Sequence, residues 1–212
     1  MIKKLPRGVL IAFEGIDGGG KTTHVSKMVN RLTEEGYAVE AFREPTNGRW
    51  GKKIREMARK GREKMTPQEE LDLFLKDRQE DVEHNIRPAL ERKKIVLLDR
   101  YYYSNMAYQG ALGLDPLDIQ KANEAFAPRP DLVILLQVSP KVGLARLKEG
   151  RGGNIDPVYE QEAYLTRVQE IFDGLEAPYI HRLNAERTLE EVTAKIQEVI
   201  EDILKRMAPD AC

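Results

Sequence analysis

Residues 9–22 read VLIAFEGIDGGGKT, and this stretch decides the fold. Its first five residues are apolar and end near a glycine-rich turn, which is typical of a strand buried on both faces. Helical spacing then predicts a helix over 24–32. A buried strand that leads through a tight turn into a helix indicates an α/β architecture, so we expect the rest of the chain to alternate strands and helices.

The remaining sequence follows this pattern. Apolar runs typical of buried strands recur at 38–42, 95–98, 132–138 and 179–183. The clearest helix start is Thr66, where proline follows and Glu69 completes a capping box. The chain has 212 residues, enough for one well-buried domain and too few for two comfortable ones. We therefore predict a single α/β domain spanning 1–212, with helices on both faces of a parallel sheet.

Composition limits the classes of partner. The 34 Lys and Arg residues nearly balance the 35 Asp and Glu residues, which argues against a nucleic acid partner and leaves phosphate binding to a local site. Cys212 is the single cysteine and cannot form an internal disulfide, which fits a reducing cytoplasm. No apolar run approaches the roughly 20 residues of a membrane span. We expect a cytoplasmic protein with no membrane partner.

Residues 15–22 fit the pattern G-x-x-x-x-G-K-[ST] of a phosphate-binding loop, or P-loop. Glycines let backbone N–H groups turn inward around phosphate oxygens, and the following helix points its positive end at the same anion. Lys21 is expected to reach the β- and γ-phosphates of ATP, and the Thr22 hydroxyl to bind Mg²⁺. The residues expected to bind ATP are Gly15, Asp17, Gly18, Gly19, Gly20, Lys21, Thr22 and Thr23.

The strand predicted at 95–98 ends at Asp99. An acidic residue at this place is the usual partner for Mg²⁺ in P-loop enzymes, often through water. The predicted metal ligands are therefore Thr22 and Asp99. The alternative is a carboxylate that only belongs to the turn after the strand.

The P-loop alone does not name a reaction, because GTPases, transport ATPases and helicases also use it. No asparagine is followed by lysine, so the Asn-Lys-x-Asp motif expected of a GTPase is missing. The Ser-Gly-Gly signature of ABC-type ATPases is missing as well. The chain has instead three arginines that are placed to hold a second anion.

Arg43 follows the second predicted strand, and Arg100 comes directly after Asp99, at the sheet edge where ligands gather. Arg78 lies in register with the apolar stripe of the helix that begins after Thr66. Because an unpaired charge is expensive to bury, an arginine on that inner face predicts an anion opposite it. The alternative for Arg78 is an ion pair with a carboxylate at the edge of the core.

Residues 101–110 read YYYSNMAYQG. On a helix, Tyr101, Asn105 and Tyr108 share a face, with Ser104 and Gln109 beside it. Amides and hydroxyls next to aromatic rings offer a pyrimidine base both edge hydrogen bonds and a stacking surface. The alternative is that these tyrosines serve packing.

Several motifs together resemble the thymidylate kinase family. They run in order from about Leu10 to about Phe172 and read FEGID at 13–17, REP at 43–45, LFLKDR at 73–78, DRY at 99–101 and SN-x-AYQG at 104–110. The resemblance implies a three-layer P-loop NTPase fold with a five-stranded parallel sheet, a short mobile lid at about 146–160, and a homodimer. It also implies transfer of the γ-phosphoryl of ATP to dTMP, giving ADP and dTDP.

The resemblance assigns roles around the acceptor. Arg78 and Arg100 would hold the acceptor phosphate, while Asp17 would contact the deoxyribose 3′-hydroxyl. Phe74 would stack on thymine. The full set expected to bind the acceptor is Asp17, Arg43, Phe74, Arg78, Arg100, Ser104, Asn105, Tyr108 and Gln109.

Within this set, Asn105 or Gln109 would read the base edge, and Tyr108 would crowd a ribose 2′-hydroxyl. Two alternatives to the dTMP kinase reading stay open. The chain could phosphorylate another acceptor, such as dUMP or a deoxynucleoside. It could also be a nucleotide-binding regulator without turnover.

Two places depart from the family pattern. Thr46 stands where the family commonly continues with glycine, and the lid stretch 156–160 reads DPVYE in place of Asp-Arg-[Phe/Tyr]-Glu. Some relatives carry a catalytic arginine in the P-loop, where this chain has Gly18. The transferring phosphoryl is therefore expected to depend on Arg146 or Arg151, with Lys148 as a helper. The predicted catalytic residues are Lys21, Arg100, Arg146 and Arg151.

Overall fold

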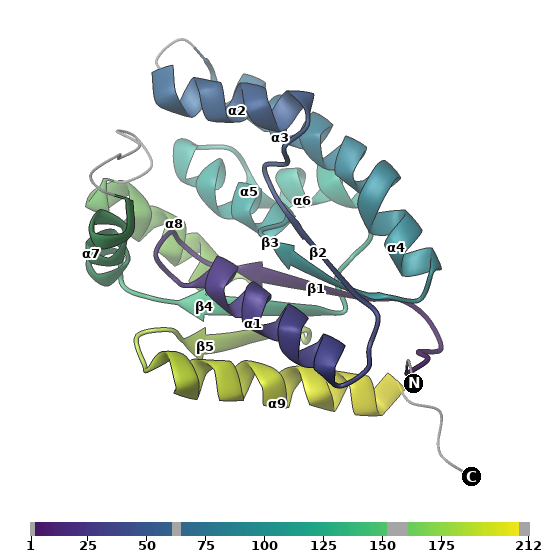
Figure 1. Ribbon diagram of the computed structural model, residues 1–212. Coiled ribbons are helices and arrows are strands. Elements are labelled where there is room, and N and C mark those ends of the chain that lie inside the picture. Colours follow the sequence, from purple (N-terminus) through teal and green to yellow (C-terminus); the bar gives the residue numbers. More distant parts are fainter. Residues whose placement is uncertain (1–2, 61–64, 152–160, 208–212) are drawn as a thin grey trace.

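The computed structural model describes residues 3–60, 65–151 and 161–207 (Figure 1). Within these ranges five strands form one parallel sheet in the order β2-β3-β1-β4-β5. The strands are β1 Val9–Glu14, β2 Val39–Arg43, β3 Ile95–Asp99, β4 Leu132–Gln137 and β5 Ile180–Asn184. This sheet confirms the predicted fold class, and each strand falls within two residues of its predicted position.

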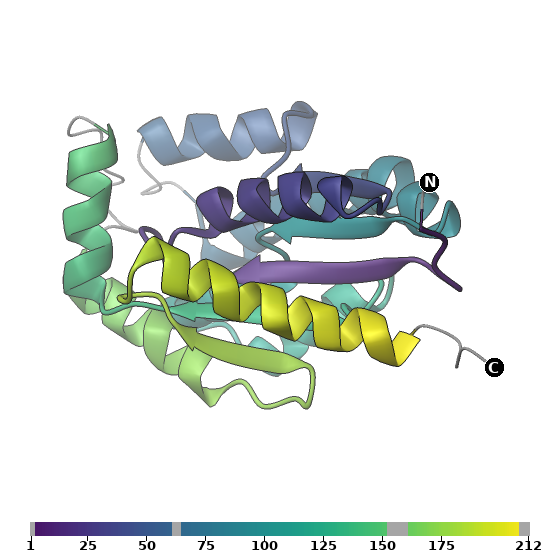
Figure 2. The same cartoon turned by 60° about the horizontal axis from the view of Figure 1, so that its bottom comes forward.

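Helices cover both faces of the sheet (Figures 1 and 2). On one face lie α1 Lys21–Glu34 and α9 Leu189–Met207. The opposite face carries α5 Tyr102–Tyr108, α6 Pro116–Glu124 and α8 Glu162–Gly174. The remaining elements are α2 Arg49–Lys60, α3 Pro67–Asp81, α4 Arg87–Glu91, α7 Pro140–Arg151, the π-helical turn η1 Val82–Ile86 and the 3-10 turn η2 Gly110–Leu112.

The predicted capping box at Thr66 is present. The backbone N–H of Glu69 donates to the Thr66 hydroxyl oxygen at 3.2 Å, and the Glu69 carboxylate accepts from the Thr66 N–H at 2.8 Å. This cap fixes the start of α3, which packs against α2 in a helical pair beside the sheet (Figure 1). None of the described helices is long and apolar enough to cross a membrane.

The strand register decides where the polar residues lie. β1 and β3 are buried along their whole length, as their apolar runs predict. Phe13 and Arg43 are both paired with Asp99, so the loops after three neighbouring strands leave the sheet at the same edge. The P-loop, Arg43 and Arg100 therefore converge at the carboxyl edge of the sheet, where parallel α/β folds bind their ligands.

Candidate active site

The P-loop leaves β1 and enters α1 as its sequence requires. Gly18 has a φ of 82°, a left-handed conformation that favours glycine. A Cβ atom on Gly18 would lie 2.3 Å from the carbonyl oxygen of Gly143 in α7. The loop and α7 therefore meet backbone to backbone, and no side chain, arginine included, fits at position 18 in this arrangement.

Lys21 is folded into the loop. Its ammonium nitrogen donates to the carbonyl oxygens of Gly15 at 2.9 Å and Ile16 at 2.8 Å, and the residue is 5% exposed. Burial lowers the pKa of the Lys21 ammonium to about 8, and the charge of Arg100 acts in the same direction. An anion placed in the loop would relieve both effects, so the site is electrostatically suited to phosphate.

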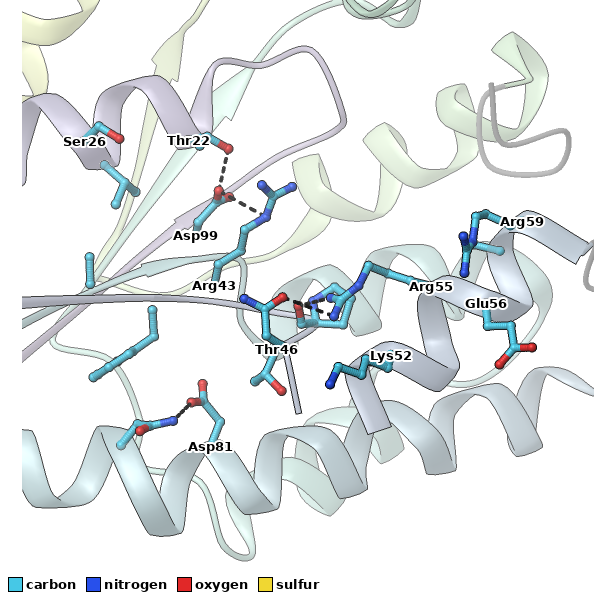
Figure 3. Close-up of a pocket in the computed structure, with 17 residues that line it drawn as sticks. Thr22, Ser26, Arg43, Thr46, Lys52, Arg55, Glu56, Arg59, Asp81 and Asp99 are labelled. Carbon is cyan, nitrogen blue, oxygen red and sulfur yellow. Dashed lines mark hydrogen bonds and ion pairs between the residues drawn. The ribbon is translucent and has the colours of Figure 1, made fainter. Parts of the chain in front are cut away.

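Thr22 and Asp99, the predicted metal ligands, lie together (Figure 3). The Thr22 hydroxyl donates to a carboxylate oxygen of Asp99 at 2.5 Å, and the Arg43 guanidinium lies 3.6 Å from the same oxygen. Hydroxyl and carboxylate oxygens are the donors that Mg²⁺ prefers. The described residues include no group of three or more His, Cys, Asp or Glu able to hold a metal. An ion bound here would therefore need water and nucleotide phosphates to complete its coordination, as Mg²⁺ commonly does.

A groove of about 1220 Å³ opens beside this pair and runs from Thr22 and Asp99 past Arg43 to α2 (Figure 3). Helix α2 lines it with three cations, Lys52, Arg55 and Arg59. Sequence reasoning missed them, although their spacing of three and four residues places them on one side of a helix. Arg55 donates to the carbonyl oxygen of Pro45 at 2.9 Å, so it holds the loop after β2.

Arg100 is the centre of a second cluster. One guanidinium nitrogen lies 2.7 Å from the Asp17 carboxylate, the other donates to the Ser104 hydroxyl at 2.9 Å, and the group lies 5.2 Å from the centre of the Tyr108 ring. The Tyr108 hydroxyl accepts from the Asp17 N–H at 3.3 Å. Burial raises the pKa of Tyr108 to about 12, so its hydroxyl stays protonated. Four of the residues predicted at the acceptor thus meet in space.

Arg100 also has an unusual backbone. Its φ is 75°, in the left-handed region that non-glycine residues rarely occupy. Its own N–H donates to the carbonyl oxygen of Phe13 at 3.0 Å, which ties it to β1. Backbone strain of this kind persists where the surrounding structure enforces it, often at functional sites.

Arg78 faces a protein anion. It is 1% exposed and forms an ion pair with Glu44, whose two carboxylate oxygens accept from the Arg78 Nε at 3.1 and 2.9 Å. Its Nη1 donates to the side-chain oxygens of Asn105 at 2.6 Å and Asn123 at 2.5 Å. In this structure the anion opposite Arg78 is therefore the carboxylate of Glu44, as in the ion-pair alternative, and most of the Arg78 donors are engaged.

The predicted base-reading residues lie beside Arg78. Asn105 donates its amide N–H to the Gln109 side-chain oxygen at 3.0 Å, and both residues are buried. Phe74 is partly buried and packs with Ile54 and Leu73 between α2 and α3. The amides therefore lie on α5 and at its end, while the predicted stacking ring belongs to the α2–α3 pair.

Of the two arginines predicted to act from the lid, the structure describes the side chain of Arg146 only. Arg146, on α7, donates to the carbonyl oxygens of Ala185 at 2.9 Å and Gly18 at 3.3 Å, so it reaches the P-loop. Lys148 is exposed on the same helix. The side chain of Arg151 and the lid stretch 156–160 lie outside the described residues.

Comparisons with known proteins show the family to which the chain belongs. A family model described as thymidylate kinase matches residues 13–196. The chain is 46% identical over 194 residues to the thymidylate kinase of Akkermansia muciniphila, covering 92% of each chain. It is 43% identical over 196 residues to a probable thymidylate kinase of Archaeoglobus fulgidus, covering 92% of this chain and 96% of that protein. The thymidylate kinase of Desulfotalea psychrophila is 44% identical over 198 residues. The chain belongs to the thymidylate kinase family.

Proposed function

We propose that the protein transfers the γ-phosphoryl group of ATP to dTMP, giving ADP and dTDP. The observation that carries this proposal is the meeting of two clusters at one sheet edge. Lys21 and the Thr22–Asp99 pair form one cluster, while Arg100 and Asp17 form the other. The first suits a nucleoside triphosphate with a metal ion, and the second offers a cation and hydrogen-bonding groups to a second nucleotide.

On the donor side, Lys21 binds the β- and γ-phosphates, and the backbone N–H groups of the P-loop surround their oxygens. Thr22 and Asp99 hold Mg²⁺ directly or through water. When bound, Mg²⁺ neutralises charge on the phosphate oxygens. Arg146 already contacts the Gly18 carbonyl, so it is the described lid arginine best placed to compensate charge on the transferring group.

On the acceptor side, Arg43 and Arg100 hold the phosphate of dTMP. An ionised oxygen of that phosphate forms a bond to the γ-phosphorus of ATP, while the bond to the β–γ bridging oxygen breaks and ADP leaves with the electron pair. A phosphate monoester has its second pKa near 6, so the attacking oxygen needs no general base at neutral pH. The protein's contribution is therefore positioning and charge neutralisation.

Around the deoxyribose and base, Asp17 contacts the 3′-hydroxyl and Tyr108 lies where a 2′-hydroxyl would be crowded. Phe74 stacks on the base, with Asn105 or Gln109 at its edge. Arg78, locked to Glu44 and Asn105, supports this wall instead of holding the phosphate. The Arg78–Asn105 contact thereby fixes the orientation of an amide that could read the base.

The experiment that tests the function is ADP release from ATP and Mg²⁺ with a panel of acceptors: dTMP, dUMP, dCMP, dGMP, UMP and thymidine. We expect a selective response to dTMP. A dominant response to dUMP or to thymidine would instead assign the enzyme to one of the alternative acceptors. ATP binding with a flat panel would identify a nucleotide-binding regulator.

The homodimer rests on the family resemblance, whereas the cytoplasmic location rests on the cysteine content of the sequence. We propose a single domain over 1–212 that forms homodimers and acts in the cytoplasm. Light scattering on the purified full chain measures the mass of the assembly. A mass equal to the 24.2 kDa of one chain would contradict the homodimer.

A further inference from the structure

Glu14 is a buried carboxylate at the centre of the site. It is the last residue of β1, immediately before the P-loop, and its exposed fraction is 0%. A carboxylate that is removed from water needs hydrogen-bond donors or cations around it. Its partners therefore indicate what Glu14 does.

Those partners are the first residues of α5. One carboxylate oxygen of Glu14 accepts from the backbone N–H groups of Tyr101 at 2.8 Å and Ser104 at 3.2 Å. The other accepts from the Ser104 hydroxyl at 2.6 Å. The helix itself has no side-chain cap at Tyr101. Glu14 thus supplies from another strand the cap that α5 lacks, because its carboxyl oxygens accept hydrogen bonds from the N-terminus of the helix.

Ser104 passes this contact on to Arg100. The Ser104 hydroxyl oxygen that donates to Glu14 accepts from Nη1 of Arg100 at 2.9 Å. The other guanidinium nitrogen, Nη2, lies 2.7 Å from Asp17. Glu14 and Asp17 flank the P-loop turn, so both ends of this chain of contacts are anchored on β1 and the loop that follows it.

The Arg100 backbone needs such support. Its left-handed φ of 75° places Arg100 in a conformation that is unfavourable unless the neighbouring backbone is held. Glu14 holds the next N–H along the chain, that of Tyr101, while Phe13 holds that of Arg100 itself. Consecutive residues of β1 thereby fix consecutive N–H groups of the turn that carries Arg100.

We propose that Glu14 is a positioning residue for Arg100, which in turn holds the acceptor phosphate; this inference rests on the proposed function. Glu14 holds the turn after β3 through the N–H of Tyr101 and the start of α5 through the N–H of Ser104, and it orients the guanidinium through the Ser104 hydroxyl. Its burial keeps it away from the reacting atoms, so it acts through Arg100.

The test compares Glu14→Gln and Glu14→Ala in steady-state ADP release. Glu14→Ala removes every contact, and we expect its KM for dTMP to rise roughly 10- to 100-fold, since a displacement of about 1 Å can cost about 10²-fold. The KM for ATP should change less, because the hydrogen bonds of the Glu14 carboxyl go to Tyr101 and Ser104 on the acceptor side, whereas Lys21 is held by the carbonyl oxygens of Gly15 and Ile16. Glu14→Gln keeps an oxygen for the backbone N–H groups, so it should recover part of the loss.

Asp131→Asn is the matched control. The Asp131 carboxylate also accepts a backbone N–H of β1, that of Leu10 at 2.9 Å, but at the other end of the strand. We expect this variant to lower the melting temperature and leave both KM values unchanged. If it produced the same selective rise in the KM for dTMP, the effect would come from loosening β1 and the positioning role would be refuted. Parallel rises in both KM values for the Glu14 variants would refute it too.

Ser104→Ala keeps the proposal testable if Glu14→Ala does not fold. It removes the relay hydroxyl alone, so the KM for dTMP should rise in the same direction, and adding Glu14→Gln should give less than the product of the two separate changes. If the two changes in the KM for dTMP simply multiplied in the double variant, Glu14 and Ser104 would act independently, which would contradict a contact relayed through Ser104. If dTMP did not stimulate ADP release by the wild-type protein, the proposed function itself would be overturned. If dTMP stimulated the wild type and the Glu14 variants kept the wild-type KM for dTMP, only the role of Glu14 would be overturned.

Discussion

The proposed donor and acceptor sides of the active site are built in different ways. The proposed donor side is local: residues 15–22 supply the loop, its lysine and one of the two proposed metal ligands, and Asp99 is the distant addition. The acceptor side consists of side-chain pairs between distant segments, because Arg100 pairs with Asp17 across 83 positions and Arg78 with Glu44 across 34. The proposed donor side thus comes mainly from one continuous segment, whereas the proposed acceptor side depends on how distant segments pack.

The largest effect should come from the donor side. Lys21→Ala removes the ammonium that compensates phosphate charge, so we expect kcat to fall by about 10³-fold or more. Steady-state ADP release with saturating dTMP measures the loss. Thermal unfolding is the control, because a loss of kcat in a variant that still unfolds cooperatively separates the catalytic effect from a folding defect. A kcat within about tenfold of wild type would show that the P-loop lysine is not required.

The next largest effect should come from Gly18→Ala. This variant tests whether the proposed donor side depends on the backbone contact between the P-loop and α7. The new Cβ would lie 2.3 Å from the Gly143 carbonyl oxygen, so the loop or α7 must move. We expect kcat/KM for ATP to fall about 10²-fold. Gly113→Ala is the matched control, since Gly113 has a φ of 102° and a Cβ there would meet nothing within 4 Å. If both variants lost ATP efficiency equally, backbone strain and not the α7 contact would be responsible.

The two arginines of the acceptor side should respond differently. Arg100 lies beside the P-loop with its side chain 14% exposed, so Arg100→Ala should raise the KM for dTMP roughly 10- to 100-fold with little change for ATP. Arg78→Ala leaves Glu44 buried without its cation, so it should lower the free energy of unfolding by about 3–5 kcal/mol. Urea unfolding and steady-state kinetics on both variants separate these effects. Equal losses of dTMP and ATP affinity in Arg100→Ala would contradict its acceptor role.

The same contrast explains how much the sequence could predict. Strand positions follow from apolar runs, and the P-loop follows from spacing within eight residues, so both were predictable without knowledge of the fold. The Thr22–Asp99 contact was predictable as well, because parallel strands place their carboxyl ends at one edge. In each case the physical cause acts over a short range or follows directly from the sheet topology.

What escaped prediction are the partners of charged side chains. The register of α3 correctly placed Arg78 inward, but only the fold shows that Glu44 lies opposite it. Helix α2 also carries cations whose exposure to the groove depends on how α2 packs on α3. Pairings of this kind are decided by tertiary packing, which a periodic pattern does not contain.

The smallest predicted effect is a pH dependence confined to the donor side. Burial gives Lys21 a folded-state pKa of about 8, below its ordinary 10.5. Between these values the unfolded chain binds more protons, so this group makes the native state more stable as pH rises. Bound phosphate favours the ammonium, so ATP binding should take up about half a proton at pH 8 and most of one at about pH 9, and weaken by at most about tenfold per pH unit. Titration calorimetry in two buffers of different ionisation enthalpy measures the uptake. Binding of dTMP in the same range should take up less, because Arg100 and Tyr108, which lie nearest the proposed acceptor phosphate, titrate well above it. If ATP binding to Lys21→Ala still took up a proton, the proton would belong to another group. The proposed difference between the two sides would then not hold.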